Sequence, residues 1–185
     1  AQIGDKVLAR LGAWADDKDY TLGTVAEIIG KAGVHDVEMR ALALGQGFSS
    51  DFPPGVVKEA HQLEASGKDM IAAEAATVGT GPRRDFRDAP TCTIDPFDAK
   101  DFDDALSVRA LPDGNYEVGI HIADVSFFVR PGDAFDKEAR ERATSVYLVD
   151  RTIPMLPEVL SNNLCSLVQG EDRLAVSAVF TLDKD

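Results

Sequence analysis

The sequence lacks several features that would place it in a particular class of protein. No apolar run approaches the roughly 18 residues that a membrane-spanning helix needs, and the first residues do not resemble a signal peptide. There are only two cysteines, Cys92 and Cys165, each in an apolar setting, and no Cys/His cluster that suggests zinc. We therefore expect reduced core cysteines in a cytoplasmic protein that does not contact a membrane.

Positive charge is also scarce. The 185 residues carry 19 Lys and Arg against 32 Asp and Glu, a net charge of −13, which disfavours a protein that binds nucleic acid over a broad basic surface. If the substrate is RNA, the basic groove has to be local or to lie outside this chain. The hydrophobic content of 44% is ordinary for a globular protein, and the length allows one large domain or a small one plus part of another.

One segment stands out because of its crowded negative charge. Residues 93–105 carry five carboxylates within ten residues, between apolar stretches at 91–94 and 105–108 that we expect to form buried strands. The carboxylates belong to Asp95, Asp98, Asp101, Asp103 and Asp104. Two carboxylates about 4 Å apart repel each other by roughly 4 kcal/mol at an effective dielectric of about 20. A fold can keep such carboxylates in one segment in three ways: they point apart into water, some of them remain protonated, or a cation binds between them.

The spacing of the aspartates favours a hard divalent cation, Mg²⁺ or Mn²⁺. Asp101 and Asp104 would meet across one helical turn, and Asp101 and Asp103 would share one face of an extended chain. Oxygen ligands suit these metals. A solvated acidic loop remains the alternative, whereas the twelve-residue calcium-loop pattern is absent. Lys100 interrupts the apolar run that would precede a phosphate-accepting aspartate.

The first part of the chain predicts a small β-structure. Residues 6–11 and 20–29 read as two strands around a polar turn at 16–19, with Gly30 ending the second strand. Two such strands suit the closing half of an OB-type β-barrel, which would bind strands of nucleic acid. A structural β-hairpin explains them equally well.

Helices and a second domain follow. The spacing predicts helices at 36–44 and 56–65, the second ended by Gly67, and a flexible joint of Gly, Thr and Pro at 79–82. Further on, we expect strands at 116–123 and 173–182 and helices at 134–144, capped by Asp133, and at 158–167. The predicted fold class is α+β, with a domain boundary near residue 80 that divides the chain into residues 1–80 and 81–185.

Other side chains invite a functional interpretation. His121 and Asp124 are candidates for a catalytic couple, but no nucleophile motif accompanies them, so we expect the histidine to be structural or to orient metal ligands. Tyr147 either packs in the core or offers its ring to a base. The arginine-rich run 83–87 either meets phosphates or pairs with its neighbouring aspartates.

Four blocks, in order, resemble the ribonuclease II/ribonuclease R (RNB) family, with ribonuclease R the nearer branch. They are Thr93 to Ala105, His121-Ile122-Ala123-Asp124-Val125-Ser126, Ile153-Pro154-Met155-Leu156-Pro157 and Leu160-Ser161-Asn162-Asn163-Leu164-Cys165-Ser166-Leu167. Residues 1–80 resemble, more weakly, the end of the family's second cold-shock domain and its helical linker. The resemblance implies a partial OB-type barrel and linker, followed by the N-terminal part of a mixed α/β catalytic domain that is truncated here.

The resemblance also implies a function. The family hydrolyses single-stranded RNA from its 3′ end to nucleoside 5′-monophosphates with the help of a divalent metal, Mg²⁺ with Mn²⁺ as the alternative. Asp95, Asp101 and Asp104 match the family's metal-coordinating aspartates. Asp103 matches the aspartate most critical for the chemical step, and Tyr147 matches an aromatic residue that stacks near the RNA 3′ end. Asp98 falls at a position that the family does not require.

These expectations have limits set by length. The family's catalytic arginine and C-terminal RNA-binding barrel would lie beyond residue 185, so we expect the isolated chain to be weakly active or inactive. We expect a monomer whose partner is single-stranded RNA. One alternative is a non-catalytic RNA-binding relative of the same fold, which the intact set of aspartates disfavours. A metal-binding module unrelated to RNA is another.

Overall fold

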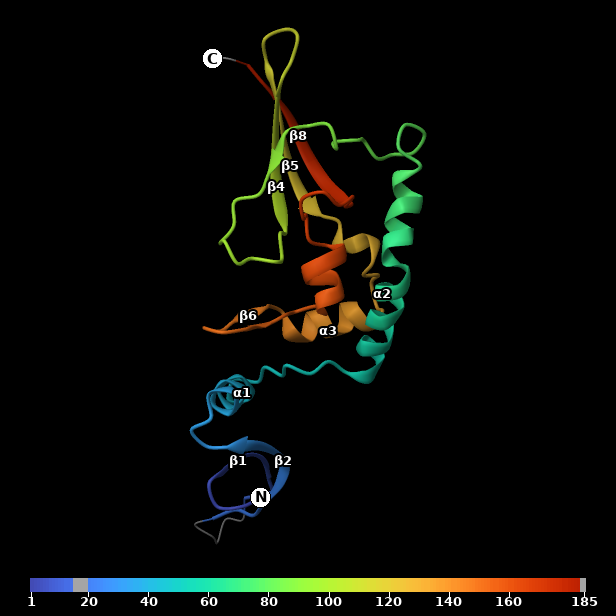
Figure 1. Ribbon diagram of the computed structural model, residues 1–185. Helices are drawn as coiled ribbons and strands as arrows, with labels where there is room; N and C mark the ends of the chain where they lie inside the picture. The colour runs from blue at the N-terminus through green and yellow to red at the C-terminus, as the bar shows by residue number, and fades with distance from the viewer. Residues whose placement is uncertain (15–19, 184–185) are drawn as a thin grey trace. The chain divides into compact units, whose positions relative to one another are not determined.

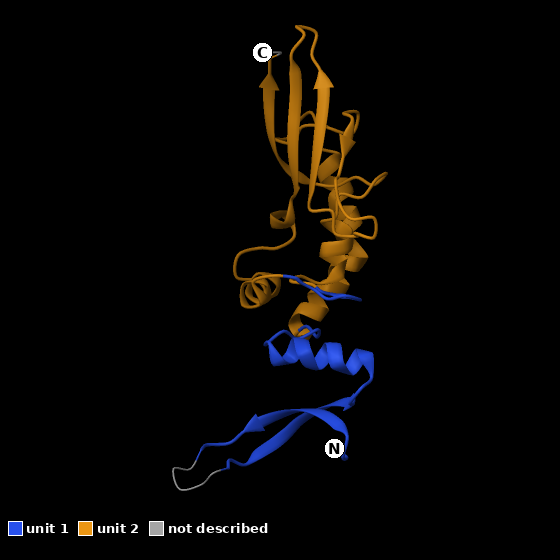
Figure 2. Cartoon of the chain, turned by 90° about the vertical axis from the view of Figure 1, so that its left-hand side faces the viewer, with its two compact units in different colours: residues 1–52, 145–153 blue, residues 53–144, 154–185 orange. Residues whose placement is uncertain are grey.

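The computed structural model describes residues 1–14 and 20–183, so the polar turn predicted at 16–19 lies outside the described residues. The chain forms two compact units, one of Ala1–Phe52 with Ser145–Ile153 and the other of Pro53–Thr144 with Pro154–Asp185 (Figure 2). Helices and strands are mixed, which confirms the predicted α+β class. The two units are defined by which residues are in contact, and this does not test where the chain divides into domains along the sequence. The predicted domain boundary near residue 80 therefore stays a prediction.

The first unit contains both predicted N-terminal strands and the helix that follows them. Strand β1 (Asp5–Leu11) pairs antiparallel with β2 (Gly23–Lys31), and α1 (His35–Gly45) comes next. Gly30 lies inside β2, which continues one residue further than predicted, to Lys31; its φ of +146° is a backbone conformation that favours glycine. A Cβ at Gly30 would lie 2.5 Å from Val37 Cγ2. The described residues form no closed barrel.

A short hairpin from much later in the sequence belongs to the first unit. Strand β6 (Val146–Tyr147) pairs antiparallel with β7 (Thr152–Ile153). The turn between them is closed by a hydrogen bond of 2.8 Å from Leu148 N to Arg151 O. Local sequence patterns do not predict that residues 145–153 belong with residues 1–52.

The second unit is built on a four-stranded antiparallel sheet in the order β3-β4-β5-β8, and Figure 1 shows its three long strands side by side. Strand β5 (Tyr116–Ala123) has the predicted bounds, while β4 (Asp104–Ala110) and β8 (Ala175–Leu182) differ from their predicted bounds by a few residues. The strand predicted at 91–94 shrinks to β3 (Thr91–Cys92) and is exposed, because it is a sheet edge that pairs only with β4. The prediction that Cys92 lies in the core is therefore wrong.

The two faces of this sheet differ in burial. On one face of β4 and β5, Ala105, Ser107, His121 and Ala123 are buried. Alternate residues point to the other face, which is apolar and open. That face carries the exposed side chains of Val108, Ile120, Ile122, Val176, Phe180 and Leu182. The sheet therefore rests on its helices through one face only.

The helices of the second unit are α2 (Pro54–Ala75), η1 (Val125–Phe127), α3 (Ala134–Arg142) and η2 (Leu160–Leu164). Asp133 caps α3 as predicted, since its carboxylate accepts a hydrogen bond of 2.7 Å from Asp136 N. The helix predicted at 158–167 begins at Glu158 as predicted, but it ends at Leu164 and is π-helical over η2, where Cys165 N donates to Leu160 O. No helix in the described ranges is long and apolar enough to cross a bilayer.

The prediction that Gly67 ends the second helix is wrong. Helix α2 runs for 22 residues straight through Gly67, which is buried. A Cβ at this position would lie 2.3 Å from Leu164 Cδ1 and 2.9 Å from its Cδ2. The glycine is therefore used for close packing of α2 against η2, and it does not break the helix.

Gly67→Ala tests this contact. Alanine is the better helix former by about 0.5–1 kcal/mol, but overpacking a filled core costs about 1–3 kcal/mol. Because Leu164 is buried and has little room to move, we expect Gly67→Ala to lower the free energy of unfolding in urea by about 1 kcal/mol. Gly55→Ala, in the same helix with nothing within 4 Å of the new Cβ, is the control and should not destabilise. Equal effects of the two substitutions would contradict the close packing.

Candidate active site

All five clustered aspartates lie on the segment that joins β3 to β4. Asp104 is the first residue of β4 and pairs with Ile122 of β5, and the others precede it in the loop. The first half of the loop is open to solvent, with Ile94 85% exposed and Phe97 fully exposed. The second half, residues 100–104, lies against the rest of the unit.

Backbone hydrogen bonds hold this second half in place. Ala123 N donates to Asp103 O at 2.9 Å, and Leu167 N donates to Phe102 O at 2.9 Å. Ser166 Oγ donates to Lys100 O at 2.6 Å and accepts from Phe102 N at 3.0 Å. The carboxylates therefore sit on a backbone that is tied to β5 on one side and to the turn after η2 on the other.

The charges of three of the aspartates act on a fourth, Asp103. Partial desolvation raises the pKa of the Asp103 carboxyl, and the negative charges of Asp101, Asp104 and Asp95 raise it further, in that order. The residue as a whole still exposes much of its surface to water. Asp98 is not among the charges that act on Asp103, which agrees with leaving it outside the predicted site.

The donor set suits a hard divalent cation in its chemistry. It offers only carboxylate oxygens, and a cation would relieve the repulsion that raises the pKa of Asp103. In the described part of the chain, however, no three His, Cys, Asp or Glu side chains lie close enough together to hold a metal ion. The assignment of Asp95, Asp101 and Asp104 as metal ligands therefore stays a prediction.

Tyr147 lies on the β6–β7 hairpin of the first unit, and its side chain is 66% exposed, so it is not a core residue. The same hairpin is fixed to α1 by ion pairs. His35 Nε2 lies 3.0 Å from Asp150 Oδ2, and Arg151 bonds to Asp36. The predicted stacking of Tyr147 on RNA stays a prediction.

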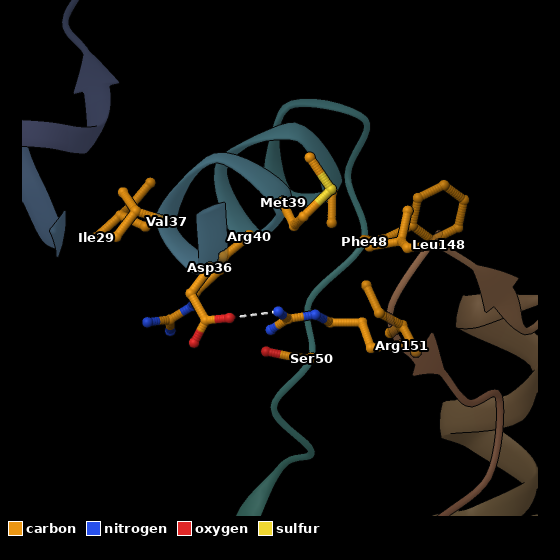
Figure 3. Close-up of a pocket in the computed structure, with 11 residues that line it drawn as sticks. Ile29, Asp36, Val37, Met39, Arg40, Phe48, Ser50, Leu148 and Arg151 are labelled. Atoms are coloured by element: carbon orange, nitrogen blue, oxygen red, sulfur yellow. Dashed lines mark hydrogen bonds and ion pairs between the residues drawn. The ribbon is translucent and has the colours of Figure 1, made fainter. Parts of the chain in front are cut away.

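A pocket of about 230 Å³ lies beside these ion pairs, within the first unit. Figure 3 shows apolar side chains around it: Met39 of α1, Phe48 of the segment that follows α1, and Leu148 of the hairpin, with the Arg151–Asp36 bond at its edge. The second guanidinium in the pocket, that of Arg40, pairs with Glu27 at 2.7 Å. Apolar contact and charge together hold the hairpin that carries Tyr147.

Comparison with known proteins identifies the family. An RNB domain model matches residues 83–185 and a cold-shock domain model matches residues 1–53. This chain belongs to the ribonuclease II/ribonuclease R (RNB) family. Ribonuclease R of Thermotoga maritima is 40% identical to it over 189 residues, which is all of this chain and 25% of that protein. The chain thus spans about a quarter of the length of this curated relative.

Solved structures agree with this assignment. Mycoplasma genitalium RNase R, in complex with ribose-methylated single-stranded RNA, has a TM-score of 0.81 and 26% identity, covering 97% of this chain and 27% of that one. Yeast Ssd1, described as a pseudonuclease, has the same fold at a TM-score of 0.67 and 20% identity, covering 98% of this chain and 22% of that one. The RNB fold is therefore shown, while nuclease activity has to be argued from the site.

In this RNB chain, His121 and Asp124 do not form a catalytic couple with each other. The ring of His121 lies 2.8 Å from Ser107 Oγ through Nε2 and 2.7 Å from Ser177 Oγ through Nδ1. Burial lowers the pKa of His121, so the ring is neutral near pH 7. This histidine joins β4, β5 and β8 beneath the carboxylate segment, which is a structural role.

The arginines of residues 83–87, at the start of the segment that the RNB domain model matches, form ion pairs. Arg83 donates to Asp124 Oδ2 at 2.7 Å and to Glu74 Oε1 at 2.8 Å, which ties α2 to the end of β5. Arg84 bonds to Glu117, and Arg87 bonds to Asp85 and Asp172; these pairs favour the structural interpretation of the run. Sequence analysis did not single out the Arg83–Asp124 pair, because nothing in the spacing links residues 41 apart.

Arg83→Met tests this pair through its pH dependence. Burial would raise the pKa of Asp124, but hydrogen bonds from Ser126 and Arg83 outweigh it and lower the pKa below its ordinary value. The ionised carboxylate therefore stabilises the fold above about pH 4, and this contribution is lost as the pH falls through the lowered pKa. Without Arg83 the charge stays buried and unpaired, so we expect the free energy of unfolding at pH 7 to fall by about 3 kcal/mol.

Urea denaturation at pH 7, 5 and 3 measures this effect. The deficit of Arg83→Met should shrink toward pH 3, where Asp124 can be protonated in the variant at little cost. The control is Arg140→Met, which removes an exposed i,i+4 pair with Asp136 and should cost about 0.5 kcal/mol or less. A deficit in Arg83→Met that is the same at all three pH values would contradict a role in holding the Asp124 charge.

Proposed function

We propose that the whole protein of which this chain is part is a 3′–5′ exoribonuclease that hydrolyses single-stranded RNA to nucleoside 5′-monophosphates with the help of a divalent metal, Mg²⁺ or Mn²⁺. The observation that carries the proposal is the set of four electrostatically coupled aspartates on an anchored segment in an RNB chain. Because the chain spans about a quarter of its curated relative, the activity belongs to the whole protein. The 185 residues alone are weakly active or inactive.

The four aspartates have two different roles. Asp95, Asp101 and Asp104 hold the metal, and Asp103 is the residue most critical for the chemical step. When bound, divalent ions supply an activated water and stabilise the charge on the leaving 3′ oxygen. Hydrogen bonds at Phe102 N, Phe102 O and Asp103 O fix the backbone from which Asp101, Asp103 and Asp104 project. The charge of the set repels stray anions until metal is present.

Tyr147 provides the second contact with RNA. Its exposed ring offers a stacking surface for a base near the 3′ end, and stacking tolerates any base because each has a π-face. Preference for single strands then comes from stacking and channel width and does not need base-edge recognition. With a net charge of −13, this chain does not supply a broad basic surface, so much of the RNA-binding surface lies elsewhere in the protein. The protein acts as a monomer in the cytoplasm.

A non-catalytic RNA-binding relative of the same fold is the second candidate. The likeness to yeast Ssd1 shows that the fold alone does not decide between the two. The complete set Asp95, Asp101, Asp103 and Asp104 favours the enzyme, since a binding protein has no need to keep like charges together. A whole protein that binds RNA but releases no monophosphates with Mg²⁺ would favour the second candidate.

Asp103→Asn in the whole protein tests the chemical role. The change keeps the shape of the side chain and removes its charge, so we expect the rate of monophosphate release from oligo(A) with Mg²⁺ to fall about a hundredfold or more, while RNA affinity stays within about threefold. Asp98→Asn is the matched control, because it removes a charge from the same segment outside the site. Similar turnover in the two variants would remove Asp103 from the mechanism.

Tyr147→Ala and Tyr147→Phe together test stacking. Loss of one base–aromatic stack costs about 1–3 kcal/mol, so Tyr147→Ala should weaken binding of a labelled oligo(A) by about 5- to 150-fold. Tyr147→Phe keeps the ring and should bind within about threefold of wild type. Fluorescence anisotropy in EDTA measures affinity without turnover. Equal affinities of the two variants would show that the ring does not stack on RNA.

A further inference from the structure

The pocket in the first unit is formed by two segments that lie far apart in the sequence. One wall comes from β2, α1 and the segment after α1, all within residues 1–53, which the cold-shock domain model matches. The other wall comes from the β6–β7 hairpin that carries Tyr147. Both walls belong to the same compact unit, so the pocket is a feature of this unit by itself. The carboxylate segment does not contribute to it.

The pocket has an apolar interior and a polar mouth. The lining residues that are buried, Ala43 and Ile153, are apolar, whereas Asp36, Ser50 and Arg151 are exposed. Its volume of about 230 Å³ is below the roughly 300–1,000 Å³ of pockets that hold drug-sized ligands. The pocket therefore suits one small ring system and not a long flexible chain.

The charges at the mouth disfavour an anionic ligand. Each guanidinium that lines the pocket already pairs with two carboxylates: Arg40 with Glu27 and Asp51, and Arg151 with Asp36 and Asp150. Four negative charges thus surround two positive ones. A phosphate group entering here would meet an excess of negative charge, whereas an uncharged ring would not.

We propose that this pocket binds one base of single-stranded RNA and leaves the phosphates outside. The proposal rests on the proposed function, since it requires RNA as the substrate. Proteins recognise unpaired bases by stacking them on aromatic rings and guanidinium planes and by hydrogen bonds to the base edge. The pocket offers the ring of Phe48 and the guanidinium of Arg151 for stacking, and the hydroxyl of Ser50 and the carboxylate of Asp36 for the base edge. The hairpin then contacts two bases of one strand, one at Tyr147 and one in the pocket.

Ser50→Leu in the whole protein tests the pocket by filling its mouth. Ser50 is exposed, so leucine adds bulk there without removing a core contact. Loss of one bound base should weaken binding of a labelled oligo(A) by about 5- to 150-fold, measured by fluorescence anisotropy in EDTA. The matched control is Gln46→Leu, which adds the same side chain at an exposed position that does not line the pocket and should bind RNA as wild type does.

Two further measurements show whether a base, and not a phosphate, is bound. In oligo(A) with a single abasic site, one position other than the one that Tyr147→Ala affects should weaken binding to wild type and have no further effect in Ser50→Leu. The weakening caused by Ser50→Leu should be the same factor at about 50 and 200 mM salt, because no phosphate contact is lost.

Each outcome decides the proposal. Wild-type RNA affinity in folded Ser50→Leu overturns it, and so does a loss that becomes smaller at high salt, since the pocket would then hold a phosphate. An abasic site that weakens Ser50→Leu as much as wild type at every position also overturns it. If Ser50→Leu does not fold, the smaller Ser50→Val is judged by the same criteria, and failure of both to fold overturns the proposal because the mouth would then be packed and not open.

Failure of the proposed function looks different. Wild-type protein that does not bind oligo(A) refutes the proposed function itself. Wild-type affinity in Tyr147→Ala together with weakened binding in Ser50→Leu supports the pocket and removes only the stacking role of Tyr147.

Discussion

The carboxylates of residues 95–104 repel one another, and the surrounding backbone has to hold them in place against that repulsion. A segment with five aspartates within ten residues gains nothing electrostatically from compactness, since two carboxylates about 4 Å apart repel by roughly 4 kcal/mol at an effective dielectric of about 20. Its shape has to come from the backbone. The peptide groups of residues 100–103 supply it, through bonds to Ser166, Leu167 and Ala123. Desolvation raises the pKa of Asp103, and the negative charges of Asp101, Asp104 and Asp95 raise it further.

The arginines near this segment do not relieve that repulsion. Arg83, Arg84 and Arg87 pair with acidic residues on α2, β5 and neighbouring loops. These pairs fasten the elements that surround the carboxylates, so positive charge is used to hold the scaffold. The site keeps a negative field of the kind that favours a divalent cation over an anion.

The sequence predicts well whatever depends on local spacing. The bounds of β5, the Asp133 cap and the helical spacing of α1 all follow from patterns of a few residues. Prediction from the sequence fails where the structure depends on contacts between residues that are far apart in the sequence. Gly67 looks like a helix end by its residue type, but it is a contact with Leu164 that only the folded chain reveals. Ser166 lies in a block that carries the family resemblance, yet nothing in that block shows that its hydroxyl reaches Lys100 and Phe102.

This separation in sequence has a consequence for function. Lys100 and Ser166 are 66 residues apart, so the geometry of the carboxylates exists only after the turn behind η2 has packed. The presence of the aspartates in the sequence therefore does not by itself establish their arrangement. Nor does the fold decide the chemistry, since it is shared by the ribonuclease R of Mycoplasma genitalium and by the yeast protein described as a pseudonuclease. What the chain does has to be argued from its side chains and tested by the substitutions that remove them.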